Sequence, residues 1–120
     1  MTIYFLRHAD AENMAASDFE RNLTPKGLEQ AAKVGRFCKA HGLAPDRILT
    51  SPLNRARQTA EIVAKALGAE PVVQDWLACG MRLETLLKEL SAQGKVESLL
   101  VVGHEPDFSS VISELIGASE

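Results

Sequence analysis

Hydrophobic residues along this chain follow two different spacings, and each spacing predicts its own kind of element. Residues 3–6 are all apolar, and a second strongly apolar run covers 98–102. Continuous apolar runs of this length are typical of strands that are buried on both faces of a parallel sheet. A shorter run at 47–50 and a weak one at 71–73 predict two more strands. The chain is therefore expected to contain four short strands.

Between these runs, apolar residues recur every three or four positions, which predicts helices with one buried face. The expected helices cover roughly 25–41, 52–67, 83–94 and 107–117. The first two begin with the same pair of signals, a hydroxyl residue followed by proline, at Thr24-Pro25 and Ser51-Pro52. The hydroxyl can cap a helix, and proline at the first helical position loses no hydrogen bond.

The alternation of strands and helices predicts an α/β fold of three layers, α/β/α, around a mostly parallel, doubly wound sheet. With 120 residues, the chain is expected to form one domain over 1–120. Right-handed crossovers bring the carboxyl ends of all strands to one edge of the sheet, where ligands bind. His8, Ser51 and His104 follow three of the predicted strands, so we expect them at that edge.

Composition excludes several other classes of protein. Apolar residues make up 46% and charged residues 24% of the chain, close to globular averages. A net charge of −3 gives no general attraction to nucleic acid or to an anionic membrane. No apolar stretch approaches the roughly 20 residues that span a bilayer, so a cytoplasmic protein is expected. There, Cys38 and Cys79 are expected to be reduced and structural.

The residues expected at the sheet edge predict a site for a phosphate dianion. Arg7 and Arg55 carry planar forks that pair with phosphate oxygens, and the helix expected after Ser51 adds free backbone N–H groups. The glycine-rich loops that bind nucleotides are missing from the sequence, so side chains would have to hold the phosphate. Two histidines, His8 and His104, make covalent phosphoryl transfer possible.

Four sequence motifs, in order along the chain, resemble those of the histidine phosphatase (phosphoglycerate mutase-like) superfamily, and most of all its SixA-type phosphohistidine phosphatase branch. They are Arg7-His8, Arg21-x-Leu23-Thr24-x-x-Gly27, Ser51-Pro52-Leu53-x-Arg55-Ala56-x-Gln58-Thr59-Ala60 and Val102-Gly103-His104-Glu105-Pro106. Four motifs in one order are far more specific than any one of them. The resemblance extends from residue 3 to about residue 116.

The resemblance implies a phosphatase that removes phosphoryl groups, above all from phosphohistidine on proteins. It implies that His8 is phosphorylated during turnover, and that Arg7, Arg55 and His104 complete the phosphate pocket. Arg21 would also reach the substrate phosphate. Neither a metal ion nor an organic cofactor is expected in this family.

Two features depart from the family pattern. Many relatives have glycine where this chain has Ala9, which is a small change. SixA-type chains usually continue for some tens of residues with further strands, whereas this sequence ends at Glu120. Either the sequence is truncated at its C-terminal end, or the sheet lacks the family's C-terminal strands, which would leave the helix at 107–117 poorly covered and an edge open to association. The sequence does not predict the oligomeric state.

The general acid is the least defined role. Glu105 is the first candidate, Asp10 and Asp18 are alternatives, and the site could also work without an acid. Phosphohistidine can leave as neutral imidazole, whose conjugate acid has a pKa of about 6.5, so it needs little protonation. An alkyl phosphate would need a strong proton donor.

Three other functions remain open at this point. A small-molecule phosphomonoesterase, or a mutase, would use the same fold and the same residues. A module that binds phosphohistidine without turnover would need the arginines alone. A metallohydrolase would use His8, Asp10, Glu12 and His104 as ligands. The arginines beside both histidines would repel a divalent cation, which argues against the metal site.

Overall fold

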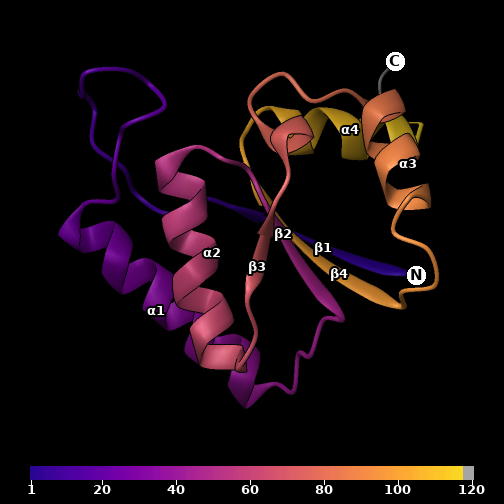
Figure 1. Cartoon of the computed structure of the whole chain (residues 1–120), viewed down its shortest axis with the longest axis horizontal. Helices are drawn as coiled ribbons and strands as arrows, with labels where there is room; N and C mark the ends of the chain where they lie inside the picture. Colours follow the sequence, from indigo (N-terminus) through magenta and orange to yellow (C-terminus); the bar gives the residue numbers. More distant parts are fainter. Residues whose placement is uncertain (118–120) are drawn as a thin grey trace.

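The computed structural model describes residues 1–117, and in this part of the chain four parallel strands alternate with four α-helices (Figure 1). The strands are β1 (Thr2–Arg7), β2 (Arg47–Thr50), β3 (Pro71–Val73) and β4 (Ser98–Gly103). The helices are α1 (Pro25–Ala40), α2 (Asn54–Leu67), α3 (Leu83–Ser91) and α4 (Asp107–Leu115), and a 3-10 helix, η1 (Asp75–Leu77), precedes α3. The predicted α/β class and the order of elements are confirmed.

The strands lie in the order β1-β4-β2-β3, and every neighbouring pair is parallel. The register aligns their carboxyl ends, because Arg7 pairs with Gly103 and Thr50 pairs with Val102. The residues that follow these strands therefore leave the sheet at one edge. This edge is where the sequence places its histidines.

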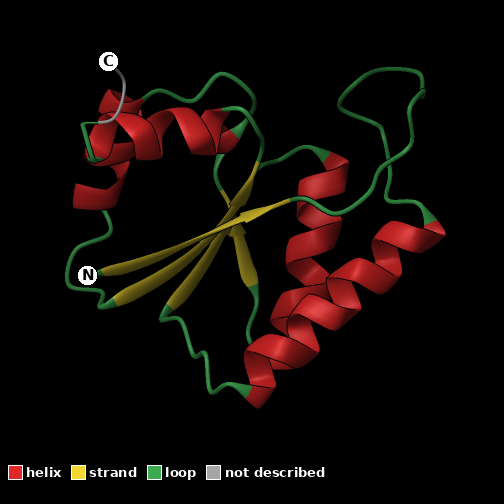
Figure 2. Cartoon of the chain, turned by 180° about the vertical axis from the view of Figure 1, so that it is seen from behind, coloured by secondary structure: helices red, strands yellow, loops and turns green. Residues whose placement is uncertain are grey.

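Successive residues of β4 point to opposite faces of the sheet and divide the core into two apolar clusters. Leu99 and Val101 pack in the cluster beneath α3 and α4, whereas Leu100 and Val102 pack in the cluster beneath α2. Figure 2 shows α1 and α2 on one side of the sheet and α3 and α4 on the other. This arrangement is the predicted three-layer, doubly wound fold.

The second helix starts later than predicted. Its first residue is Asn54, and its N-cap is Leu53, whose side chain cannot accept a hydrogen bond. The hydroxyl of Ser51 does accept the backbone N–H of Leu53, at 3.2 Å, but this bond closes a turn before the helix. The expected start at Pro52 was wrong because Ser51 faces His104 rather than the first helical turn. By contrast, Thr24 caps α1 as expected, by accepting the N–H of Gly27.

The apolar stripes of the last two helices predict buried positions for Leu87, Ile112 and Leu115, but these residues lie at the surface. Ile112 and Leu115 of α4 are 37% and 50% exposed, and Leu87 of α3 is 47% exposed. Both helices are short, with nine residues each, so a narrow stripe of apolar side chains covers their face of the sheet.

Cys38 is buried and free, as predicted for a structural cysteine, whereas Cys79 is free and exposed. The expectation of a structural role for Cys79 was wrong, because it lies on a loop near the candidate site.

No helix within residues 1–117 is long and apolar enough to cross a membrane.

Candidate active site

His8 follows β1 directly, and both of its ring nitrogens have partners. Nδ1 lies 2.7 Å from the carbonyl oxygen of Ala9, and the guanidinium Nε of Arg55 lies 3.3 Å from Nε2. A carbonyl can only accept, so the ring carries its proton on Nδ1. Arginine can only donate, so Nε2 presents its lone pair to Arg55. Both contacts select the same tautomer, with Nε2 available as a nucleophile.

Burial lowers the pKa of His8 below its usual value of 6.5, and the positive charges of Arg55, Arg7 and Arg21 lower it further. The bond to the Ala9 carbonyl acts in the opposite direction but does not reverse the shift. His8 is therefore neutral at pH 7, which a nucleophilic histidine requires.

His104 follows β4, and its ring lies beside that of His8, with 5.4 Å between ring centroids. It is 2% exposed, and Nε2 lies 2.7 Å from the hydroxyl of Ser51. Burial, helped by the charge of Arg55, lowers the pKa of His104 to about 4. Two neutral imidazoles thus stand side by side at the end of the two neighbouring strands β1 and β4.

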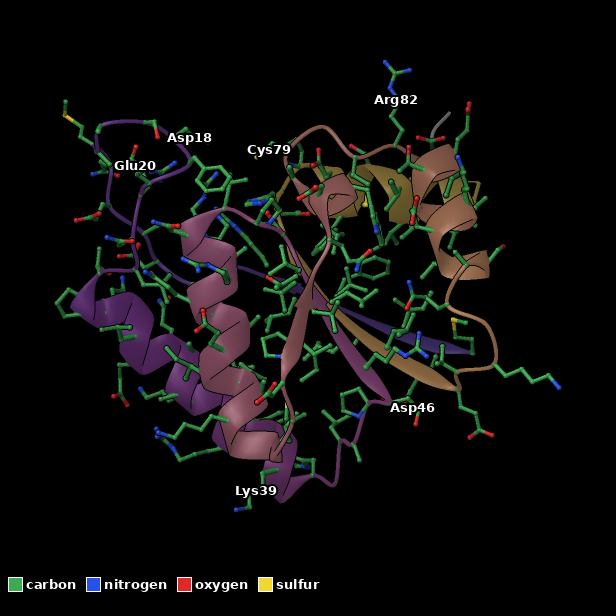
Figure 3. All side chains as sticks on the ribbon, in the orientation of Figure 1. Asp18, Glu20, Lys39, Asp46, Cys79 and Arg82 are labelled. Atoms are coloured by element: carbon green, nitrogen blue, oxygen red, sulfur yellow. The ribbon has the colours of Figure 1, made fainter. Side chains whose placement is uncertain are left out.

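Arg55 lies in the first turn of α2 and is 4% exposed. Besides His8, it contacts the loop between β1 and α1, because its Nη1 donates to the carbonyl of Asp18 at 2.9 Å and its Nη2 to the Asp18 carboxylate at 3.2 Å. Nη2 also lies 3.8 Å from the sulfur of Cys79. Figure 3 shows that Asp18 and Cys79 come from different connections, the first after β1 and the second after η1. The buried guanidinium of Arg55 thus lies between His8 and a carboxylate, which shows that an anion can be held at this position.

Arg7 and Arg21 line a polar cavity of about 350 Å³ in front of His8. The other residues that line it are Ala9, Asp10, Ala11, Asn13 and Gln30. Arg21 is held in place by two contacts of its own loop, since it donates to the carbonyl of Glu12 and to the carboxylate of Asp18. The cavity has room for a phosphoryl group and for part of whatever carries it.

The backbone that follows His8 is fixed against the start of α1. A side chain at Gly27 would place its Cβ 2.0 Å from the carbonyl oxygen of Asp10, so only glycine fits there. The same carbonyl accepts the N–H of Thr24 at 3.0 Å, and the N–H of Asp10 donates to Gln30 at 2.9 Å. The close approach of α1 therefore holds the peptide segment that follows His8.

Each of the three candidate acids already has a partner. Glu105 accepts the N–H of Ser109 at 2.9 Å and its hydroxyl, and these bonds lower the pKa of the Glu105 carboxyl. The bond to Arg21 is the main reason why the pKa of Asp18 is lowered. Asp10 accepts the hydroxyl of Thr24 at 2.6 Å. Glu105 and Asp18 are thus ionised at pH 7 and poor proton donors.

The metal-site alternative finds no support in the geometry. Within residues 1–117, His, Cys, Asp and Glu side chains form no group of three or more that could hold a metal ion. His8 and His104 are close together, but Asp10 points to Thr24 and Glu12 accepts the N–H of Asn22.

Two positioning contacts were not foreseen from the sequence. Thr59 accepts the N–H of Ala9 at 3.0 Å and donates to the carbonyl of Arg55 at 2.7 Å, so one hydroxyl links the peptide after His8 to α2. Ser51 was expected at the edge, but not as a partner of His104. The spacing of four residues between Arg55 and Thr59, which puts both on one helix face, was the available signal for the first contact.

Comparison with known sequences places these residues in a family. The family model of the histidine phosphatase superfamily (branch 1) matches residues 3–78. The chain is 32% identical to the phosphohistidine phosphatase SixA of Escherichia coli over 120 residues, which cover 96% of this chain and 74% of that protein. It is also 35% identical to a SixA homolog of Haemophilus influenzae, over 98% of this chain and 78% of the relative.

Solved structures show the same similarity. A crystal structure of a SixA protein from Agrobacterium tumefaciens superposes with a TM-score of 0.86 at 33% identity, and covers 95% of this chain and 76% of that one. A protein histidine phosphatase SixA in complex with tungstate superposes with a TM-score of 0.85 at 32% identity, over 96% and 76% of the two chains. From its sequence motifs, its fold and these relatives, the chain is a phosphatase that belongs to branch 1 of the histidine phosphatase superfamily.

Proposed function

We propose that this phosphatase removes the phosphoryl group from phosphohistidine on a protein, through a covalent phosphohistidine intermediate at His8. The observation that carries the proposal is the pair of bonds that leaves Nε2 of His8 unprotonated beside Arg55. A neutral imidazole with a free lone pair next to a buried guanidinium suits attack on a phosphoryl group. Its two relatives named SixA are phosphohistidine phosphatases by name, which supports the same substrate class here.

In the first step, Nε2 of His8 attacks phosphorus in line with the leaving nitrogen. A new N–P bond forms as the P–N bond of the substrate breaks, and its electron pair goes to the departing ring, which leaves as neutral imidazole because its other nitrogen carries a proton. Arg7, Arg21 and Arg55 would hold the phosphoryl oxygens and offset their charge. His8 becomes cationic as it is phosphorylated, and the Ala9 carbonyl that accepts from Nδ1 stabilises that charge.

In the second step, water attacks the phosphorus of phospho-His8, and His8 leaves as a neutral imidazole. The water oxygen becomes the fourth oxygen of inorganic phosphate, and the two water protons leave on the phosphate or pass to solvent. The leaving group of this step has the same chemistry as the leaving group of the first. A site that works without a strong general acid therefore suits both steps.

The three candidate acids are all held in other hydrogen bonds, which favours phosphohistidine over alkyl phosphates. Glu105 and Asp18 are ionised and already bound by Ser109 and Arg21. An alkoxide leaving group would need a proton from such a residue, whereas imidazole does not. A SixA relative binds tungstate, a tetrahedral oxyanion like phosphate, which supports an anion-binding site in this chain as well.

The test compares substrates with different leaving groups. We would incubate the protein with a phosphohistidine-bearing phosphocarrier protein, with phosphoramidate, and with alkyl and aryl phosphomonoesters, each with and without a chelator. Fast hydrolysis of the N–P substrates, slow hydrolysis of the alkyl esters and no effect of the chelator are expected. Equal rates on alkyl esters would favour a small-molecule phosphomonoesterase, and loss of activity with chelator would point to a metal-dependent enzyme.

A further inference from the structure

Ser51 and His104 form a buried side-chain pair between two neighbouring strand ends. Ser51 follows β2 and is fully buried, and His104 follows β4 and is 2% exposed. The hydroxyl oxygen and Nε2 are 2.7 Å apart, which is hydrogen-bonding distance. The distance is compatible with a proton on either atom, so the other contacts of the pair must assign it.

The second contact of Ser51 decides the direction of that bond. Its hydroxyl oxygen accepts the backbone N–H of Leu53 at 3.2 Å, so one of its two lone pairs is in use. Its own proton has no acceptor other than Nε2 of His104 among the hydrogen bonds of residues 1–117. If Nε2 donated instead, this buried hydroxyl proton would be left without a partner, which costs about 1–3 kcal/mol. The hydroxyl therefore donates, and Nε2 accepts.

The other ring nitrogen of His104 is then an N–H without a partner. Within the described residues, Nδ1 of His104 is the buried side-chain nitrogen or oxygen that has no hydrogen bond. His8 and Arg55 both lie near this ring, and their charges act on it. A bare lone pair there would repel a phosphoryl oxygen, whereas an N–H would bind it.

We propose that Ser51 is a positioning residue, whose hydroxyl holds neutral His104 as the Nδ1–H tautomer so that Nδ1 donates to the phosphoryl group attacked by His8. The inference rests on the proposed function for the identity of that anion. It adds a role for Ser51, and it assigns the proton of His104 to a definite atom.

The first test reads the tautomer directly. Full-length protein labelled with ¹⁵N-histidine is studied by NMR at pH 7.5, and the His104 signals are assigned by their loss in His104→Gln. We expect the ¹⁵N shifts of a neutral ring protonated at Nδ1, and in Ser51→Ala a shift toward the Nε2-protonated form. A wild-type ring protonated at Nε2 would overturn the proposal, even if Ser51→Ala failed to fold.

The second test measures the affinity for tungstate, with no turnover involved. Ser51→Ala is expected to weaken binding about tenfold, the size of one lost hydrogen bond to an anion. Ser51→Thr, which keeps a hydroxyl, should recover most of the affinity. Thr50→Val is the matched control, because it removes a fully buried hydroxyl next door that donates to the Ser51 carbonyl and does not touch His104.

The variants separate a tautomer effect from a packing effect. Equal losses in Ser51→Ala and Thr50→Val, or tungstate affinity unchanged in a folded Ser51→Ala, would overturn the role of Ser51. The tautomer and the tungstate affinity do not depend on which substrate is hydrolysed. A protein that failed on phosphohistidine but passed both tests would contradict the proposed function alone.

Discussion

The two histidines of the site differ in how their protons are held. His8 is partly exposed and bonds to the carbonyl of the very next residue, Ala9. His104 is buried and bonds to a side chain 53 positions away, that of Ser51. The state of the first ring is thus set by local backbone, and that of the second by tertiary packing.

This difference predicts which substitutions can change the tautomer of each ring. No side-chain substitution can remove the carbonyl that orients His8, so its tautomer is protected against mutation at Ala9. At Ser51, by contrast, substitution by alanine would remove the hydroxyl that bonds to the His104 ring. His8 is therefore expected to tolerate changes around it better than His104 does. The following predictions test this contrast from the largest effect to the smallest.

Replacement of His8 should have the largest effect. His8→Ala removes the attacking nitrogen, so turnover of a phosphohistidine protein should fall by about 10⁴-fold or more, and no acid-labile phosphoprotein should form. Turnover and phosphate incorporation after a rapid quench are both measured. His41→Ala is the control, because His41 caps α1, stacks on Phe37 and is exposed. Near-normal activity in His8→Ala would exclude the covalent mechanism.

The buried ring should make the fold sensitive to acid. The pKa of His104 is about 4 in the folded chain and about 6.5 in an unfolded one, so between these values the unfolded state binds more protons. The contribution to stability is complete above pH 6.5 and is lost as the pH falls toward 4, by roughly 3 kcal/mol. His8, whose pKa is also lowered, adds a loss of the same sign that begins below pH 6.5.

Urea unfolding of wild type and His104→Gln between pH 7.5 and pH 4 measures this effect. The variant cannot gain a proton at this position, so its stability should fall less steeply with acid than that of wild type. Parallel curves for the two proteins would mean that His104 is not held neutral by its surroundings.

The sequence predicted the fold and both strand-end histidines because apolar runs are a local signal. The runs at 3–6 and 98–102 mark β1 and β4 wherever the rest of the chain lies, and a parallel register then brings His8 and His104 together. The partner of each ring was harder to predict. The bond between Ser51 and His104 depends on β2 and β4 being neighbours, which no local pattern encodes.

The errors have the same origin. Ser51-Pro52 has the local chemistry that predicts the start of a helix, but the serine hydroxyl bonds to His104 on a neighbouring strand instead. The exposure of Ile112 and Leu115 depends on which elements pack against α4, and the helical period of the sequence does not predict those elements. Local pattern thus predicts the elements, and the tertiary contacts decide what their polar atoms bind.

Loss of the Thr59 hydroxyl should reduce activity by a smaller amount, because Thr59 acts on His8 only through the Ala9 peptide. Thr59→Val keeps the shape but removes the acceptor for the Ala9 N–H, so the peptide that orients His8 can rotate. We expect kcat on phosphohistidine to fall about tenfold with KM little changed, the cost of one hydrogen bond in the transition state. Thr59→Ser should restore kcat. An equal loss in both variants would point to packing instead of the hydroxyl.

The smallest effect is expected at Glu105, although it follows His104 directly. Its carboxylate caps α4 through Ser109 and is ionised at pH 7, so it is poorly suited to donate a proton. Glu105→Gln keeps a hydrogen-bond acceptor for Ser109 and should change phosphoramidate hydrolysis by less than about threefold.

The dependence of rate on the leaving group makes this last prediction decisive. Without a general acid, hydrolysis of a series of aryl phosphates should slow steeply as the leaving-group pKa rises, equally in wild type and Glu105→Gln. A residue that donated a proton in the transition state would flatten the series in wild type alone. A tenfold loss in Glu105→Gln, about 1.4 kcal/mol of barrier, together with a flat wild-type series would make Glu105 the acid. Glu105 would then donate a proton to the leaving group beside His104, and phosphohistidine would no longer be the favoured substrate.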